Sequence, residues 1–107
     1  GNAYRSGMIN MTNNLDTVPI LTFVGPDPGI AHDALHAWWI RWRIEREHGS
    51  ARNHVMWGGP VPLLGDLEYV YRGLDAMDAW LAQVEADTSD TPLADKISRN
   101  RPGNVQD

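Results

Sequence analysis

The feature of this sequence that most constrains its fold is a pair of short apolar runs separated by one long helical segment. Val18–Val24 is a continuous β-rich run that ends before Gly25, and His54–Trp57 is a weaker run that stops at Gly58. Continuous rather than alternating apolar character is typical of strands that are covered on both faces. A strand, a covering helix and a second strand predict a right-handed parallel crossover.

Two helices are expected around these strands. Asp27 is expected to cap the first, with Pro28 at its first helical position, and this helix should continue to about Glu47, before Gly49. It is apolar nearly all round, which predicts burial on more than one face. The second helix spans roughly 66–86, where apolar residues at spacings of three and four predict one stripe packed on the protein's own sheet. The stripe consists of Leu67, Val70, Leu74, Met77, Leu81 and Val84.

The predicted fold class is α/β, with the order β-α-β-α. Residues 1–16 are interpreted as an irregular lead-in, and 87–107 as a loop, a short helix and a loose tail. Because two parallel strands do not make a stable sheet, we expect 1–107 to be a piece of a doubly wound, mostly parallel domain, or to pair with another chain. Another segment or chain would complete that sheet. Five tryptophans in so short a chain fit this view, since each buries about 150–250 Å² and part of that load can face a partner.

Composition excludes several functional classes. The net charge is −5 and no basic stripe is present, which argues against a nucleic-acid partner. No apolar run approaches the roughly 20 residues of a membrane-spanning helix. The absence of cysteine leaves no disulfide and no thiol nucleophile. No glycine loop for phosphates is visible, and neither a cofactor nor a metal is expected in the preferred interpretation.

Several short motifs resemble the C-terminal region of tannase-like proteins of the α/β-hydrolase type, a family of unknown function. Members of that family are much longer than this chain. The resemblance therefore implies a larger N-terminal segment or chain that carries the nucleophilic serine, a small-molecule ester or acyl substrate, and a secreted or periplasmic location. The motifs are Ala3-Tyr-Arg-Ser-Gly7, Val18-Pro-Ile20, His32-x-x-x-His36, Arg41-x-Arg43, Asn53-x-Val-Met56, Leu74–Leu81, Ala86–Asp90 and Arg101-Pro102.

The resemblance also implies a place for the catalytic residues. The acid is expected after the first strand, where Asp27 lies, although Asp27 could equally be a simple helix cap. The catalytic histidine usually follows the second strand, but none follows Trp57 closely, so the base would be His32 or His36. We prefer His32 because it lies in the first helical turn, near the carboxyl ends of the strands where ligands bind. His32 could instead only stabilise the helix N-terminus, and burial is the stronger expectation for His36.

Substrate contacts are predicted from the same region. Trp57 and Gly58 end the second strand and could line the site at that edge. Trp38, with its neighbours Trp39 and Trp42, could form an aromatic wall for an acyl group. Packing in the core, or against the missing part of the protein, is the alternative for these tryptophans.

Two rival functions use the same segment. One is a non-catalytic subunit whose helices only complete a partner's fold. The other is a zinc hydrolase, since His32 and His36 have the i, i+4 spacing of a helical zinc motif. There Asp33 would replace the usual glutamate base, and a third ligand is needed. The candidates for that ligand are Asp27, His48, His54 and Glu68.

Overall fold

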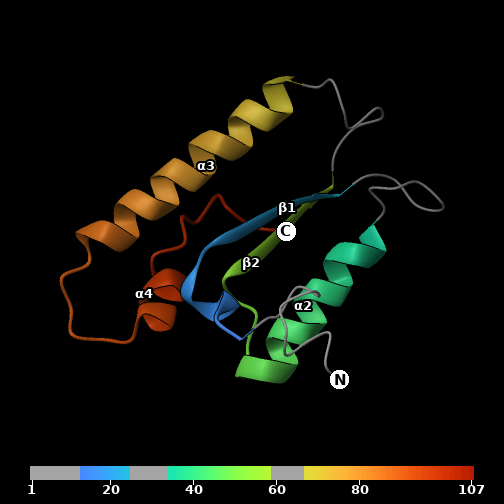
Figure 1. Ribbon diagram of the computed structural model, residues 1–107. Helices are drawn as coiled ribbons and strands as arrows, with labels where there is room; N and C mark the ends of the chain where they lie inside the picture. The colour runs from blue at the N-terminus through green and yellow to red at the C-terminus, as the bar shows by residue number, and fades with distance from the viewer. Residues whose placement is uncertain (1–12, 25–33, 59–66) are drawn as a thin grey trace.

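The computed structural model describes residues 13–24, 34–58 and 67–107 (Figure 1). Within these ranges the elements follow the order η1-β1-α2-β2-α3-α4. The predicted β-α-β-α order with one further short helix is therefore confirmed. No helix of the described part of the chain is long and apolar enough to cross a membrane.

Two parallel strands form the centre of the described molecule. β1 (Ile20–Val24) and β2 (His54–Gly58) pair so that Ile20 lies opposite His54 and Val24 lies opposite Gly58. β1 is shorter at its start than the predicted run, and β2 extends one residue beyond its predicted end. The two strands end at the same level, so the chain leaves both of them at one edge of the sheet.

One face of this sheet is covered by α2 (Ala34–His48) (Figure 1). Ala37 packs there against Val24 and Met56 in a small apolar cluster. The helix ends at Gly49, whose φ of +76° lies in the left-handed region that glycine adopts without strain. The predicted end of the first helix is thus confirmed to within one residue.

The predicted burial of α2 on more than one face is wrong. Only Ala37 and Ile44 of this helix are buried. The reason is that the described neighbours of α2, the sheet and η1, cover only part of its surface. The large apolar residues left exposed on it are Leu35, Trp38, Trp39, Ile40 and Trp42.

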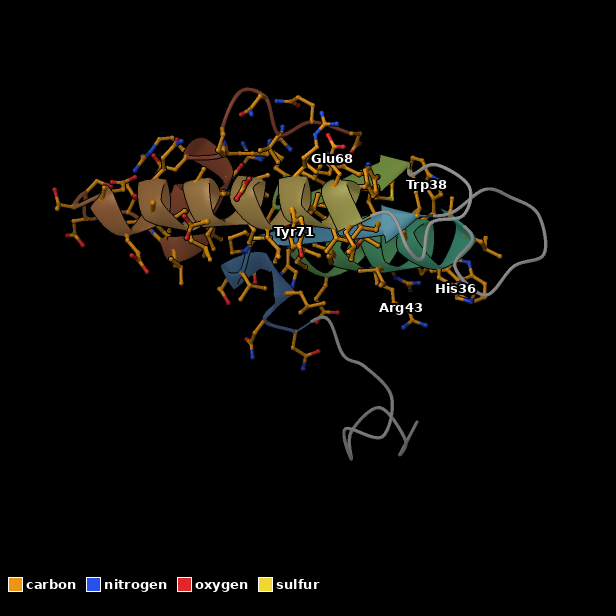
Figure 2. The ribbon with its side chains drawn as sticks, turned by 90° about the horizontal axis from the view of Figure 1, so that it is seen from above. His36, Trp38, Arg43, Glu68 and Tyr71 are labelled. Atoms are coloured by element: carbon orange, nitrogen blue, oxygen red, sulfur yellow. The ribbon has the colours of Figure 1, made fainter. Side chains whose placement is uncertain are left out.

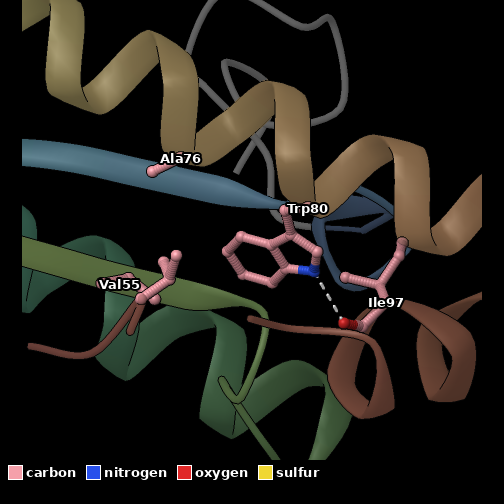
Figure 3. Packing of buried hydrophobic residues seen from close by; sticks show 5 residues of the cluster. Val55, Ala76, Trp80 and Ile97 are labelled. Atoms are coloured by element: carbon pink, nitrogen blue, oxygen red, sulfur yellow. Dashed lines mark hydrogen bonds between the residues drawn. The ribbon is translucent and has the colours of Figure 1, made fainter. Parts of the chain in front are cut away.

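The opposite face of the sheet is covered by α3 (Leu67–Ala86) and α4 (Leu93–Arg99). Trp80 of α3 is 0% exposed and packs with Val55 of β2 and Ile97 of α4 (Figure 3). Its indole Nε1 donates a hydrogen bond of 2.9 Å to the carbonyl oxygen of Ile97. One side chain therefore ties the sheet and both helices together, and the hydrogen bond satisfies its only polar atom.

The face that α3 turns to the sheet differs from the predicted stripe. Its buried residues are Gly73, Ala76 and Trp80. A Cβ atom added at Gly73 would lie 2.2 Å from Cζ of Phe23, so a side chain at this position would displace the ring of Phe23. Small residues at these positions permit the approach of α3 to the sheet, and the stripe, about 100° away around the helix, is turned outward. Leu67, Val70, Leu74 and Leu81 are exposed, while Met77 and Val84 are half-buried.

The C-terminal tail is packed, and the prediction of a loose tail is wrong. Val105 is 1% exposed and belongs to the same apolar cluster as Trp80. The indole Nε1 of Trp57 donates to the carbonyl oxygen of Gln106 at 2.8 Å. The side chain of Asp107 accepts a hydrogen bond from the backbone N–H of Met56 at 2.9 Å. The tail therefore runs alongside β2.

A short 3-10 helix, η1 (Leu15–Thr17), precedes β1. The buried side chain of Asn53, just before β2, donates hydrogen bonds to the carbonyl oxygens of Leu15 and Val18. Its own carbonyl oxygen accepts from the N–H of Ile20 at 2.8 Å. One residue thus fixes the start of both strands.

Candidate functional site

The carboxyl edge of the sheet is the expected position of a site in a parallel α/β arrangement. Val24 and Gly58 are the last paired residues of the two strands there. Asp27 and His32, the predicted acid and base, follow β1 in sequence but lie outside the described residues. Their assignment therefore stays a prediction.

His36, the second candidate base, lies in the first turn of the described part of α2. Its side chain is exposed, so the expectation of a buried histidine is wrong. The ring packs edge-on against Trp39, with 5.9 Å between the ring centroids. An exposed imidazole at this end of α2 is accessible to a substrate or to a partner chain.

Trp57 and Gly58 lie at the carboxyl end of β2, as predicted. The indole ring of Trp57 is half-buried on the α3 side, where it packs with Phe23 and Tyr69 at centroid distances of 6.2 Å from each. Its Nε1 is already bonded to the tail. Trp57 therefore supports the packing of the sheet edge, and only part of its surface is left for a substrate.

Trp38 lies on α2, which covers the opposite face from the one on which Trp57 packs. It is exposed, and the guanidinium of Arg41 lies over its ring at 5.4 Å from the centroid. In Figure 2 it points to the side of α2 opposite His36 and Arg43. The structure thus does not bring Trp38 and Trp57 into a single wall.

On the outer side of α2, a hollow of about 440 Å³ is lined by Trp39, Trp42 and Arg43.

The whole of residues 1–107 matches the model of a tannase-like family of unknown function (DUF6351). The chain belongs to this tannase-like family. The resemblance carried by the short motifs is thereby confirmed at the level of the family. No match was found among the curated proteins, and none among the solved structures.

In this member of the tannase-like family, a histidine that sequence reasoning named only as a possible zinc ligand is buried. His54, the first residue of β2, is 1% exposed, and its Nε2 lies 2.9 Å from the hydroxyl oxygen of Thr22 on β1. Burial, together with the nearby positive charge of Arg41, lowers the pKa of His54 from 6.5 to about 4. The imidazole is therefore neutral at physiological pH.

The pair of Thr22 and His54 resembles a nucleophile and its base, but it lacks the third member of a triad. Nδ1 of His54 has no hydrogen-bond partner among the described residues, whereas a catalytic imidazole is held by a carboxylate at that atom. His54 also lies at the amino end of β2, about 13 Å from the carboxyl edge at 3.3 Å per residue. We interpret this pair as part of the packing between the two strands.

Arg41 and Asp107 form a bidentate ion pair next to His54. The two guanidinium nitrogens of Arg41 donate to the two carboxylate oxygens of Asp107 at 2.6 and 2.7 Å. Hydrogen bonds from Arg41, with a further one from the N–H of Met56, lower the pKa of Asp107 to about 2. The sequence carried no signal for this pair, because 66 positions separate a helix residue from a tail that has no periodic pattern.

A shallow hollow of about 440 Å³ adjoins this ion pair. Its charged groups are of both signs, and Asp107 already neutralises Arg41, so the hollow has no strong preference for an anion. The residues that line it are Arg41, Glu45, Gly49, Ser50, Ala51, Arg52, His54, Arg101 and Asp107. None of them is a serine activated by a histidine, and we assign the hollow no catalytic role.

A zinc site finds no support among the described residues, which contain no group of three metal-binding side chains. His48 instead lies 3.5 Å from the carboxylate of Asp16, and His54 is bonded to Thr22. Glu68 is exposed on α3. His32, the partner of His36 in the predicted chelate, lies outside the described residues.

Proposed function

We propose that this chain is the C-terminal part, or the small subunit, of a serine hydrolase that cleaves an ester or a related acyl bond. The nucleophilic serine and most of the oxyanion hole would belong to another segment or chain. That segment would also complete the sheet in the manner of an α/β-hydrolase. This chain alone would be inactive.

The observation that carries the proposal is membership of a tannase-like family over the full length of the chain. The geometry supports it in one respect. Asp27 and His32 lie three and eight positions after the last residue of β1, and β1 and β2 are parallel and end in register at Val24 and Gly58. Residues placed after parallel strands lie at the edge where α/β proteins bind their ligands.

The proposed chemistry assigns one role to each residue. His32 takes the proton of the serine hydroxyl as the serine attacks the acyl carbon, and later returns a proton to the leaving alcohol. Asp27 holds the imidazole and stabilises its protonated form. His36, exposed at the described start of α2, is the alternative base.

A structural subunit is the second candidate function, and a specific observation favours it. The exposed large apolar residues of α2 and α3 are what an element buried against another chain would display. In that case the chain would complete a partner's fold without touching its substrate. The two candidates differ only in whether His32 or His36 takes part in turnover.

The deciding experiment is turnover of a short-chain p-nitrophenyl ester by the complete hydrolase that contains this chain. If His32 is the general base, His32→Ala should lower kcat by about 10²–10⁴-fold. His48→Ala is the matched control, since this histidine contacts Asp16 at the far end of α2 and should leave turnover within a few-fold. A loss confined to His36→Ala would move the role of base to His36.

Two results would reject the serine-hydrolase proposal. Full turnover in both the His32→Ala and His36→Ala proteins would leave the structural subunit as the better account. Loss of turnover on treatment with a zinc chelator, with recovery on adding zinc, would favour the metal-dependent alternative.

A further inference from the structure

The sheet has two lateral edges, the outer side of β1 and the outer side of β2. At each of them, certain backbone N–H and C=O groups point away from the neighbouring strand. The N–H of Ile20 donates to the carbonyl oxygen of Asn53. This bond and the register of the strands determine which residues of β1 and β2 bond to each other and which point outward. In a parallel pair every second residue bonds to the neighbouring strand, and the residues between them direct their N–H and C=O groups outward. Leu21 and Phe23 are the outward residues of β1. His54 and Met56 are those of β2.

The outer edge of β2 is occupied, and we call it the closed edge. The carbonyl oxygen of His54 accepts a hydrogen bond from Arg41 at 2.8 Å. The N–H of Met56 donates to Asp107 at 2.9 Å. The ion pair of Arg41 and Asp107 therefore takes the places that a further strand would need.

The outer edge of β1 is different, and we call it the open edge. No described residue bonds to the outward N–H or C=O groups of Leu21 and Phe23. Polar backbone groups at such an edge are a template for another strand. The charged side chains that block natural edges are absent from β1, whose sequence is Ile-Leu-Thr-Phe-Val.

The apolar stripe of α3 borders the open edge. In Figure 2, Tyr71 lies on the side of α3 where β1 runs, and Glu68 lies on the side of the C-terminal tail. Around the helix, Val70 and Leu74 fall between Tyr71 and the buried face that touches the sheet. They are thus placed over the position that a strand beside β1 would occupy, together with Leu67 and Leu81, which share their side of the helix.

The opposite face of that position is bordered by α2. Figure 2 shows Arg43 and His36 on the β1 side of this helix, and Trp38 on the other. Ile40, partly exposed, falls between Arg43 and the buried residue Ala37 around the helix. A strand docked at the open edge would therefore be covered by apolar side chains on its α3 face and, on its α2 face, by a surface that combines Ile40 with the charged residues Arg43 and Glu47.

We propose that the open edge of β1 accepts an apolar β-strand from another polypeptide segment. That segment inserts between the exposed flanks of α2 and α3, pairs with the outward groups of Leu21 and Phe23, and extends the sheet on that side alone. Its identity as the serine-bearing part of a hydrolase rests on the proposed function, whereas the pairing itself does not. A second copy of this chain is the competing occupant, and cross-linking distinguishes the two.

Site-specific photo-cross-linking in the complete protein tests this inference. p-Benzoylphenylalanine replaces Leu74 or Val70 on the exposed stripe, and in a matched control it replaces Ala79, which is exposed away from the stripe. We expect cross-links from both stripe positions to one extended apolar segment outside residues 1–107. We expect none from Ala79.

Cross-links from the stripe to a second copy of this chain, to residues 1–12 of the same chain, or to nothing at all would overturn the inference. Two labelled positions guard against one substitution that disturbs docking, and hydrogen exchange of the unmodified protein supplies a second readout. If the captured segment belongs to a polypeptide that has no reactive serine and hydrolyses no ester, the pairing stands and the proposed function fails.

Discussion

The closed edge and the open edge belong to the same two-stranded sheet, yet the chain treats them in opposite ways. At the closed edge, Arg41 and Asp107 bond to the outward backbone groups of His54 and Met56. At the open edge, the outward groups of Leu21 and Phe23 have no such partners among the described residues, and the exposed stripe of α3 lies beside them. In the proposed docking, β2 is the last strand of its sheet and β1 an interior one.

The two edges also differ in chemistry. The closed edge is protected by charge: a guanidinium and a carboxylate that remain partly in water, with Asp107 about half exposed. Charged groups of this kind prevent the association of sheet edges. The open edge is bordered by leucine and valine, which gain free energy when a partner covers them. The side chains at the closed edge are thus suited to water, and those at the open edge to an apolar partner.

Acid should lower the free energy of unfolding through His54, which lies at the closed edge. The pKa of His54 is about 4 in the folded protein, against 6.5 ordinarily, so the unfolded chain binds this proton first as the pH falls. Stability should be full above about pH 6.5 and decline toward pH 4, by up to about 3 kcal/mol. Urea unfolding measured across this range would show the slope, and His54→Gln should flatten it. An unchanged slope in His54→Gln would contradict the assignment.

Removing the guanidinium should open the closed edge. Arg41→Ala should lower the free energy of unfolding by about 1–3 kcal/mol, because it strips Asp107 of its partner and leaves the carbonyl of His54 without a donor. Arg46→Ala is the matched control, since Arg46 lies only over the exposed ring of Trp42, at 5.1 Å. Its effect should stay within about 0.5 kcal/mol. Equal effects in urea unfolding would show that the edge is not closed by Arg41.

The open edge should respond weakly when this chain is alone. Leu74 is 60% exposed, so Leu74→Ser should change the unfolding free energy by no more than about 0.5 kcal/mol in the chain by itself. In the complete protein the same substitution should weaken assembly, because it would place a hydroxyl in an apolar interface. Leu93→Ser on α4, at 49% exposure, is the control that should do neither. Equal assembly in the two variants would contradict a docking role for the stripe.

The order and type of the elements could be predicted because they depend on local pattern. Continuous apolar runs specified β1 and β2, and Gly49 specified the end of α2. The buried face of α3 could not be found by the same means. Counting large apolar side chains selects the leucine stripe, whereas the buried face includes two small residues, Gly73 beside Phe23 and Ala76 in the cluster around Trp80.

The stripe of α3 and the C-terminal tail were misjudged for a common reason, which is that periodicity does not say what a surface faces. The stripe is periodic and exposed, and the tail is aperiodic and packed around Val105. Pairing across a long separation, as between Arg41 and Asp107, leaves no local signal. That another segment completes the sheet stays a prediction from the number of strands, and the open edge is the position proposed for that segment.

Hydrogen exchange of the outward-facing amides of the sheet, measured residue by residue in the complete protein, tests the central claim most directly. The account predicts that the amides of Leu21 and Phe23 exchange as slowly as those of Thr22 and Met56, since a docked strand would accept their hydrogen bonds. In the chain alone the same two amides should exchange fast while Thr22 stays protected. Fast exchange at Leu21 and Phe23 in the complete protein would show that no strand pairs there, and would contradict the account.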